Sequence, residues 1–204
     1  MFYSFDGIDG GGKSTQLKLF CDWLVERGEQ VVTCRDPGST PLGEAVRELL
    51  LNRHDLEIHR RSEMLLYMAA RAQMVEQVIR PALEAGKTVV SDRFLLANVV
   101  YQGHAGGLDV DELWRIGEVA TAGIKPDLTF LLDIDPRAAA QRIRRELDRM
   151  ETQTVEFRGR LRNGFLAEAA RRPNQIRRID AGRSIEEVQV DIRRAAEEYA
   201  RTGS

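Results

Sequence analysis

The sequence predicts an α/β protein in which helices cover both faces of a five-stranded parallel sheet, in three layers. Two observations carry this prediction. Short apolar runs alternate with longer helical patterns along the chain, and such alternation is typical of parallel sheets with helical crossovers. A glycine-rich loop ending in Lys-Ser follows the first apolar run. With 204 residues, of which 43% are hydrophobic, the chain is expected to form one domain, residues 1–204, with its own core.

The strands are predicted from the apolar runs. The first four are nearly continuous in apolar character, as strands buried on both faces of a parallel sheet are. Ligands in such folds bind at the carboxyl ends of the strands. The five expected strands are residues 2–5, 31–34, 88–92, 128–133 and 176–180.

The helices are predicted from the longer patterns between these runs and from their end signals. Asp135 precedes Pro136, which combines an N-cap with a proline in the first helical position. Ser184 and Glu187 have the spacing of a capping box. The expected helices are residues 13–27, 41–51, 62–85, 109–122, 136–146, 155–171 and 184–201.

Composition excludes several classes of function. The net charge is −2, so no general affinity for nucleic acid or an anionic membrane is implied. No apolar run approaches the roughly 20 residues that span a bilayer, and the first residues lack the features of a signal peptide. Cys21 and Cys34 have no metal-type spacing and are expected to be buried thiols in a reducing compartment. We therefore expect a cytoplasmic protein.

The basic residues are unevenly distributed. The chain has 26 Arg against 4 Lys, and residues 137–178 hold twelve Arg against five acids. One interpretation is a set of solvated helix faces. The other is a mobile phosphate-binding lid near residues 142–149, because the planar guanidinium fork of arginine suits phosphate.

The glycine-rich loop matches the sequence GxxxxGK[ST] and has the expected context, after a strand and before a helix. Glycines let backbone N–H groups surround phosphate, and the helix that follows directs its positive end at the same anion. Lys13 would supply charge to the transferred phosphoryl group and Ser14 would ligate Mg²⁺. The loop predicts a three-layer P-loop fold that binds a nucleoside triphosphate, as kinases, GTPases, motor ATPases and regulators do. The residues of this site, which would bind ATP in a kinase, are Gly7, Ile8, Asp9, Gly10, Gly11, Gly12, Lys13, Ser14 and Thr15. No NKxD-type motif is present, which argues against a GTPase.

A second group of residues suggests an acceptor site. Arg35 and Arg93 follow the second and third expected strands, so they should lie beside the loop. Tyr67 and Arg71 are four residues apart on one helical face, an arrangement that can stack a base and hold an anion. Taken singly, each has an ordinary structural explanation: core packing for the tyrosine and surface exposure for the arginine.

With these residues the chain resembles the bacterial thymidylate kinases of the nucleoside monophosphate kinase group. The resemblance runs from Phe5 to about Ile192. It rests on an ordered series of segments: GIDGGGKST (7–15), RDPGSTPLGEAVRELLL (35–51), LLYMAARAQ (65–73), SDRFLLANVVYQG (91–103), PDLTFLLDIDP (126–136), ELDRME (146–151), FRGRLRNGF (157–165) and IDA (179–181).

The resemblance implies an enzyme that phosphorylates dTMP to dTDP with ATP and Mg²⁺, in dTTP synthesis, and that forms a homodimer. It implies a short Arg-rich lid at about residues 142–154. It implies that Gly10 marks the subgroup whose lid supplies the catalytic cations. The dTMP-binding residues would be Asp9, Arg35, Tyr67, Arg71, Arg93, Asn98, Tyr101 and Gln102; the catalytic residues would be Asp9, Lys13, Arg93, Arg142, Arg145 and Arg149. Ser14 and Asp92 would hold the metal, Asp92 through water.

Departures from the family pattern bear on base selectivity. Ala97 stands where a serine is usual, Val100 replaces a typical alanine, and Asp36 stands where glutamate is usual. Asn98 can donate to and accept from a pyrimidine edge. Two alternatives remain open at this stage. One is a kinase for another pyrimidine monophosphate such as dUMP, and the other is a nucleotide-binding regulator without turnover.

Overall fold

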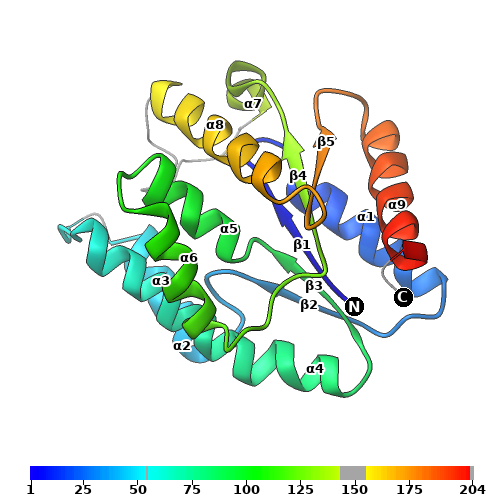
Figure 1. The fold of residues 1–204 in the computed structure, drawn as a ribbon, viewed down its shortest axis with the longest axis horizontal. Helices are drawn as coiled ribbons and strands as arrows, with labels where there is room; N and C mark the ends of the chain where they lie inside the picture. The colour runs from blue at the N-terminus through cyan, green and yellow to red at the C-terminus, as the bar shows by residue number, and fades with distance from the viewer. Residues whose placement is uncertain (54, 143–154, 203–204) are drawn as a thin grey trace.

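The computed structural model describes residues 1–53, 55–142 and 155–202. Its centre is a parallel sheet with strand order β2-β3-β1-β4-β5 (Figure 1). All four pairings are parallel, so the predicted fold class is confirmed. Each strand lies within one residue of its predicted bounds. The strands are β1 Phe2–Asp6, β2 Val31–Arg35, β3 Thr88–Asp92, β4 Leu128–Asp133 and β5 Ile176–Asp180.

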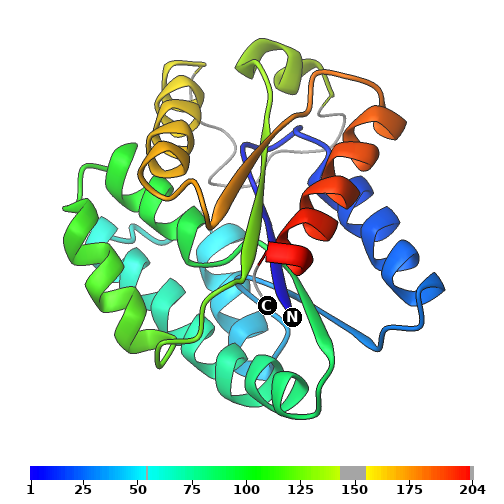
Figure 2. The ribbon, with the colours of Figure 1, turned by 45° about the vertical axis from the view of Figure 1, so that its right-hand side comes forward.

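Helices cover the sheet in two outer layers. On one side lie α1 (Lys13–Glu26) and α9 (Ile185–Thr202), and Figure 2 shows them together on the same face of the strands. The opposite layer contains α3 (Arg60–Met74), α6 (Val110–Ala120) and α8 (Val155–Arg171). The remaining α2 (Pro41–Leu51) packs on α3, and α7 (Pro136–Arg142) packs on α8.

Aromatic side chains fill the core on either side of the sheet. The ring of Phe20 in α1 contacts those of Phe5 and Phe130, with centroids 5.7 and 5.3 Å apart. Phe2 points the other way and meets Phe94 edge-on at 5.1 Å. Successive residues of β1 therefore face opposite layers, as the period of a strand requires.

The helix expected over residues 62–85 is interrupted. It consists of α3, a π-helical turn η1 (Val75–Ile79) and α4 (Arg80–Glu84). Pro81 explains the interruption, because its ring would clash with the carbonyl four residues back in a regular α-helix. The wider turn moves the backbone aside, and the N–H of Arg80 donates to the carbonyl of Val75, five residues back.

Residues 95–104 form helical turns that the sequence patterns did not indicate. They comprise α5 (Leu95–Asn98) and the π-helical η2 (Val99–His104). Every residue from Leu95 to Gly103 is buried. A helix buried all round has no polar face and therefore no 3.6-residue pattern to recognise.

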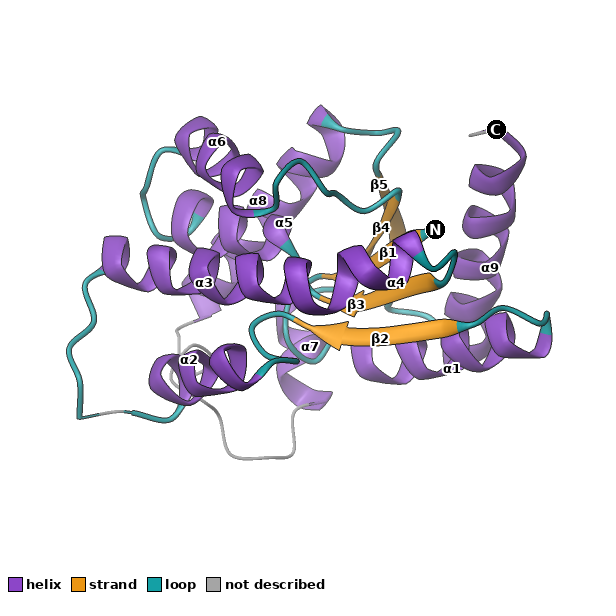
Figure 3. Cartoon of the chain, turned by 90° about the horizontal axis from the view of Figure 1, so that it is seen from below, coloured by secondary structure: helices purple, strands orange, loops and turns teal. Residues whose placement is uncertain are grey.

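The strands end together at one edge of the sheet (Figure 3). The register pairs Asp92 with Phe5 on one side and with Arg35 on the other. The ends of β1, β2 and β3 are therefore level, and the loops that follow them meet. Within the described ranges, no helix is long and apolar enough to cross a membrane.

Candidate active site

A cleft of about 1160 Å³ opens at the carboxyl edge of the sheet. It brings together predicted residues from six separate segments. Of the predicted site residues, those lining the cleft are Asp9, Gly10, Gly11, Gly12, Lys13, Ser14, Thr15, Arg35, Tyr67, Arg71, Asp92, Arg93, Asn98, Tyr101, Gln102 and Arg142. Gly7 and Ile8 complete the loop behind them and are buried. Arg145, Arg149 and the rest of the predicted lid after Arg142 lie outside the described residues.

The loop between β1 and α1 requires glycine for backbone reasons. Gly7 has φ +132°, and a Cβ there would lie 2.5 Å from the carbonyl oxygen of Leu132 in β4. Gly12 has φ +84° and occupies the N-cap position of α1 without any side-chain cap. The N–H groups of the first turn of α1 therefore face the cleft unblocked, the arrangement that binds phosphate at a helix N-terminus.

The Lys13 side chain folds back onto the glycine-rich loop. Its Nζ donates to the carbonyl oxygens of Gly7 and Ile8 at 3.1 and 3.0 Å and lies 3.3 Å from a carboxylate oxygen of Asp9. The side chain is only 8% exposed. Burial is the main cause that lowers the pKa of Lys13, with a further contribution from Arg93, while Asp9 opposes them. A cation held so close to the loop is positioned to contact a bound phosphate chain.

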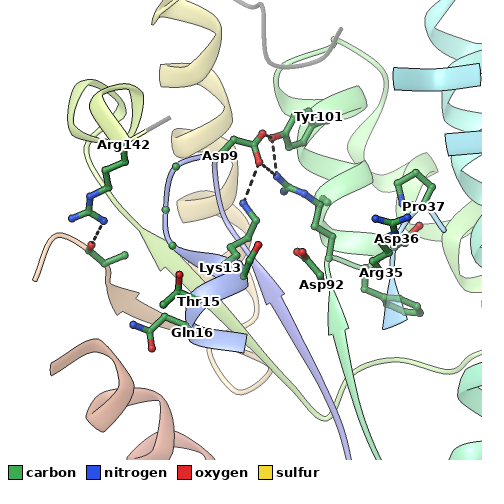
Figure 4. A pocket seen from close by; sticks show the side chains of 18 of the residues that line it. Asp9, Lys13, Thr15, Gln16, Arg35, Asp36, Pro37, Asp92, Tyr101 and Arg142 are labelled. Carbon is green, nitrogen blue, oxygen red and sulfur yellow. Dashed lines mark hydrogen bonds and ion pairs between the residues drawn. The ribbon is translucent and has the colours of Figure 1, made fainter. Parts of the chain in front are cut away.

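Asp9 joins the two halves of the cleft (Figure 4). One carboxylate oxygen accepts from Arg93 Nη2 at 2.5 Å and from Lys13, and the other accepts from the Tyr101 hydroxyl at 3.1 Å. Burial opposes ionisation, but Arg93 and then Lys13 outweigh it and hold the pKa of Asp9 well below its ordinary value. Asp9 is therefore a carboxylate that fixes one cation from each side of the cleft.

Arg93 is held by its backbone as well as by its side chain. It has φ +66°, unusual for a residue with a side chain, and its N–H donates to the carbonyl of Phe5. Its Nη1 donates to the carbonyl oxygen of Gly7 at 3.0 Å. This geometry turns the side chain back from the end of β3 to the loop after β1.

Two carboxyl groups lie beneath these cations at the strand ends. Asp6 is fully buried, and burial raises its pKa to about 7 despite the opposing charges of Arg93 and Lys13. At the end of β3, Oδ1 of Asp92 is buried and has no hydrogen-bond partner among the described atoms. The Asp92 side chain lines the cleft near Lys13 (Figure 4).

The half of the cleft that the sequence predicts to hold the acceptor, called the acceptor half below, is built from β2, α3 and α5. Arg35 is half exposed and pairs with Glu44 at 2.8 Å. Arg71 is 1% exposed, and its Nε donates to Asp36 at 2.5 Å while Nη1 donates to Oδ1 of Asn98 at 3.2 Å. Burial raises the pKa of Asp36, opposed by Arg71. The peptide between Asp36 and Pro37 is cis.

Tyr67 lies beside Arg71 on α3. The ring is half-buried, packs against the small cluster of Val46, Leu50 and Leu51, and also lines the cleft. The tyrosine therefore packs against α2 on one side and lines the cleft on the other. Its position is consistent with both the stacking hypothesis and the packing explanation.

The other end of the cleft is formed by α7 and the segment after β5. Arg142 Nη1 donates to the carbonyl oxygen of Ala181 at 3.0 Å (Figure 4). Gln16 is a buried residue that also lines the cleft, and its Nε2 donates to the carbonyl oxygen of Ile185 at 2.9 Å. The sequence prediction did not include Gln16, Ala181, Arg183, Ser184, Ile185 or Val188, all of which line this end. The capping box at Ser184 was the one available signal, since it places the start of α9 there.

Arg47 was also missed. It lines the acceptor half, and its Nη1 donates to the carbonyl oxygen of Pro37 at 3.0 Å. Nothing in the spacing of α2 distinguishes Arg47 from a surface arginine, so only the folded structure reveals it.

Comparison with known proteins gives a consistent result. A model of the family described as thymidylate kinase matches residues 5–192. The thymidylate kinase of Symbiobacterium thermophilum is 46% identical over 199 residues, covering 97% of this chain and 93% of its own length. That of Pelotomaculum thermopropionicum is 46% identical over 200 residues, covering 97% of this chain and 93% of its own. The crystal structure of thymidylate kinase from Ehrlichia chaffeensis superposes with a TM-score of 0.79 at 30% identity, covering 96% and 98% of the two chains.

Proposed function

The chain belongs to the thymidylate kinase family, and we propose that its cleft binds ATP along the glycine-rich loop and dTMP at the opposite end. It is a phosphotransferase that converts dTMP and ATP to dTDP and ADP. The single observation that supports this arrangement best is Asp9, whose carboxylate binds Lys13 on one side and Arg93 and Tyr101 on the other. The alternatives of a dUMP kinase or a non-catalytic regulator are not favoured by the comparisons.

The donor would lie between α1 and the segment after β5. The uncapped N–H groups at the start of α1 would take its phosphates, with Lys13 along the chain. Arg142 and the carbonyl of Ala181 would face the adenine end. The contact of Arg142 with Ala181 therefore supports a donor-binding role for this arginine, in addition to the lid role inferred from the sequence.

The acceptor would lie between Arg93 and α3. We assign Arg35, Arg71 and Arg93 to holding dTMP, with Tyr67 stacking on the base and Tyr101 beneath the sugar. Asn98 and Gln102 would contact the base edge. Arg93 connects this half to the loop through the Gly7 carbonyl, so it would lie closest to the reacting phosphates.

The residues present fit a bound Mg²⁺. Ser14 is exposed at the start of α1, and Asp92 carries a buried carboxylate oxygen without a partner among the described atoms. Mg²⁺ prefers oxygen ligands and usually takes one or two from protein, the rest from water and phosphate. Ser14, and Asp92 through water, would hold the ion. When bound, Mg²⁺ would neutralise charge on the phosphate chain of the donor.

Phosphoryl transfer here requires positioning and charge compensation. The acceptor phosphate is already anionic near neutral pH, so the reaction needs no general base and no covalent enzyme intermediate. Lys13 and Arg93 would stabilise the charge that develops between the two nucleotides, an effect that preorganised cations provide without reorganisation. Asp9 would hold both cations at the required separation before the substrates bind.

We also propose that the protein is a cytoplasmic homodimer. Its two cysteines are free, which suits a reducing compartment. Leu65 on α3 and Val119 on α6 are 50% and 83% exposed, and these two helices pack against each other. Large exposed apolar side chains on adjacent helices favour a protein interface. Light scattering coupled to size-exclusion chromatography tests the dimer.

The function is tested by ADP release with ATP, Mg²⁺ and a panel of monophosphates: dTMP, dUMP, dCMP, dGMP, dAMP and UMP. We expect selective stimulation by dTMP. Equal stimulation by dUMP would support the broader pyrimidine kinase. ADP release that no monophosphate stimulates would support the regulator and contradict the proposal.

A further inference from the structure

Five buried polar side chains form a continuous chain of hydrogen bonds behind the acceptor end of the cleft. Their order is Asp36, Arg71, Asn98, Gln102 and Glu63. Arg71 donates to Asn98 Oδ1 at 3.2 Å, Asn98 Nδ2 donates to Gln102 Oε1 at 2.6 Å, and Gln102 Nε2 donates to Glu63 Oε1 at 2.9 Å. All five side chains are at most 8% exposed. The chain joins α3, α5, η2 and the loop after β2.

The two ends of this chain fix the orientation of the two amides between them. An amide can present either its oxygen or its nitrogen to a neighbour, but a guanidinium only donates and a carboxylate only accepts. Arg71 therefore requires the oxygen of Asn98, and Glu63 requires the nitrogen of Gln102. If Gln102 were reversed, nitrogen would face nitrogen at Asn98 and oxygen would face oxygen at Glu63. Only the observed head-to-tail arrangement gives both amides a hydrogen bond at each of their contacts within the chain.

The orientation of the two amides determines which hydrogen-bonding groups they present to the cleft. Arg71, Asn98 and Gln102 line the cleft, whereas Glu63 does not. With this orientation Gln102 Oε1 keeps a lone pair for a ring N–H, and Asn98 Nδ2 keeps a hydrogen for a carbonyl oxygen. A ring N–H beside a carbonyl is the edge of thymine or uracil. Cytosine presents the opposite pattern, an unprotonated ring nitrogen beside an amino group.

We propose that Glu63 is a positioning residue for base selection: by holding the nitrogen of Gln102, it makes the acceptor site prefer a pyrimidine with an N–H and a carbonyl over one with an amino group. This inference rests on the proposed function, because it concerns the acceptor half of the same cleft. Glu63 acts through Gln102 and does not line the cleft itself.

The test compares Glu63→Gln with wild type. A glutamine at position 63 can donate as well as accept. A reversed Gln102 would then no longer place oxygen against oxygen at position 63, and only its unfavourable contact with Asn98 would remain. The ratio of kcat/KM for dTMP to that for dCMP should fall about tenfold, the factor that corresponds to 1.4 kcal/mol, or roughly one hydrogen bond. The KM for ATP should stay at the wild-type value. Glu76→Gln, an exposed acid paired with Arg80 farther along the same helical segment, is the matched control and should keep the ratio.

A structural role would lower activity toward both monophosphates and leave their ratio unchanged, and that result in folded E63Q would overturn the inference. If E63Q does not fold, Glu63→Asp and Glu63→Met give the same comparison. Aspartate has no donor, so E63D should keep the ratio, while E63M should lose it; equal ratios in both would overturn the inference. A wild-type protein that does not phosphorylate dTMP would instead contradict the proposed function, so the two failures are distinguishable.

Discussion

Glu168 is a buried carboxylate that joins three helical segments, and its removal is expected to destabilise the fold strongly. The side chain is fully buried in α8. It accepts from His104 Nε2 at 2.9 Å in η2 and from Trp114 Nε1 at 3.0 Å in α6, and Arg171 and Arg172 also donate to it. Because η2 also carries Tyr101 and Gln102, this contact fixes the wall of the acceptor half.

The magnitude follows from the donors that would lose their acceptor. In Glu168→Leu, the part-buried N–H groups of Trp114 and His104 lose their acceptor, at about 1–3 kcal/mol each. Arg171 and Arg172 are 49% and 26% exposed, so water can replace Glu168 as their partner and they add little. We therefore expect a loss of about 2–5 kcal/mol, mainly from the two ring N–H groups. In Glu168→Gln, the amide oxygen can still accept from Trp114 and the nitrogen can donate to a neutral His104, so we expect about 1–2 kcal/mol.

Urea unfolding followed by tryptophan fluorescence measures both free energies of unfolding. Glu197→Gln is the control, because its pair with Arg27 spans 3.4 Å between two half-exposed side chains and should contribute less than about 1 kcal/mol. If E168L unfolded within about 1 kcal/mol of wild type, or if E168Q were as destabilised as E168L, Glu168 would not be the acceptor that holds these helices together.

Three further predictions concern the cleft and the thiols. Lys13→Ala should lower turnover by at least ~100-fold with an unchanged circular dichroism spectrum, and near-normal turnover of the folded variant would contradict the assignment of the loop. Tyr67→Ala should weaken dTMP binding by about 1–3 kcal/mol if the ring stacks on the base, whereas an unchanged KM for dTMP would leave only its packing role. Burial raises the pKa of Cys34 to about 12 and that of Cys21 to about 11, so both are protonated thiols at pH 8. Only Cys34 is buried as the sequence predicted, whereas Cys21 is partly exposed on α1. Iodoacetamide should therefore label Cys21 slowly in the native protein and Cys34 only after unfolding, and rapid labelling of native Cys34 would contradict its burial.

The sheet and its loop were predictable because they depend on local chemistry. Strand bounds followed from apolar runs that are buried on both faces, and the position of Lys13 followed from the spacing of the glycines. The capping box was predictable for the same reason: Ser184 N–H donates to Glu187, and Glu187 N–H donates to the Ser184 hydroxyl at 3.2 Å. In each case the interacting groups are neighbours in sequence.

The rest depends on contacts between distant segments. The pair of Arg71 with Asp36 joins residues 35 positions apart, and no spacing in either segment indicates it. Glu168 looks in sequence like any helical acid, yet it meets His104 and Trp114 from two other segments. The acceptor residues themselves came from resemblance to a family, and their hydrogen-bond partners came only from the folded chain.

The proposed site requires that one cleft hold a donor and an acceptor with their phosphates facing each other across Asp9. A molecule in which adenosine and thymidine are joined through five phosphates spans both halves at once. Its inhibition measured against each substrate in turn is the most direct test. We expect competitive inhibition against both ATP and dTMP. Competition with only one of them would mean that the two nucleotides do not share this cleft, and would contradict the account.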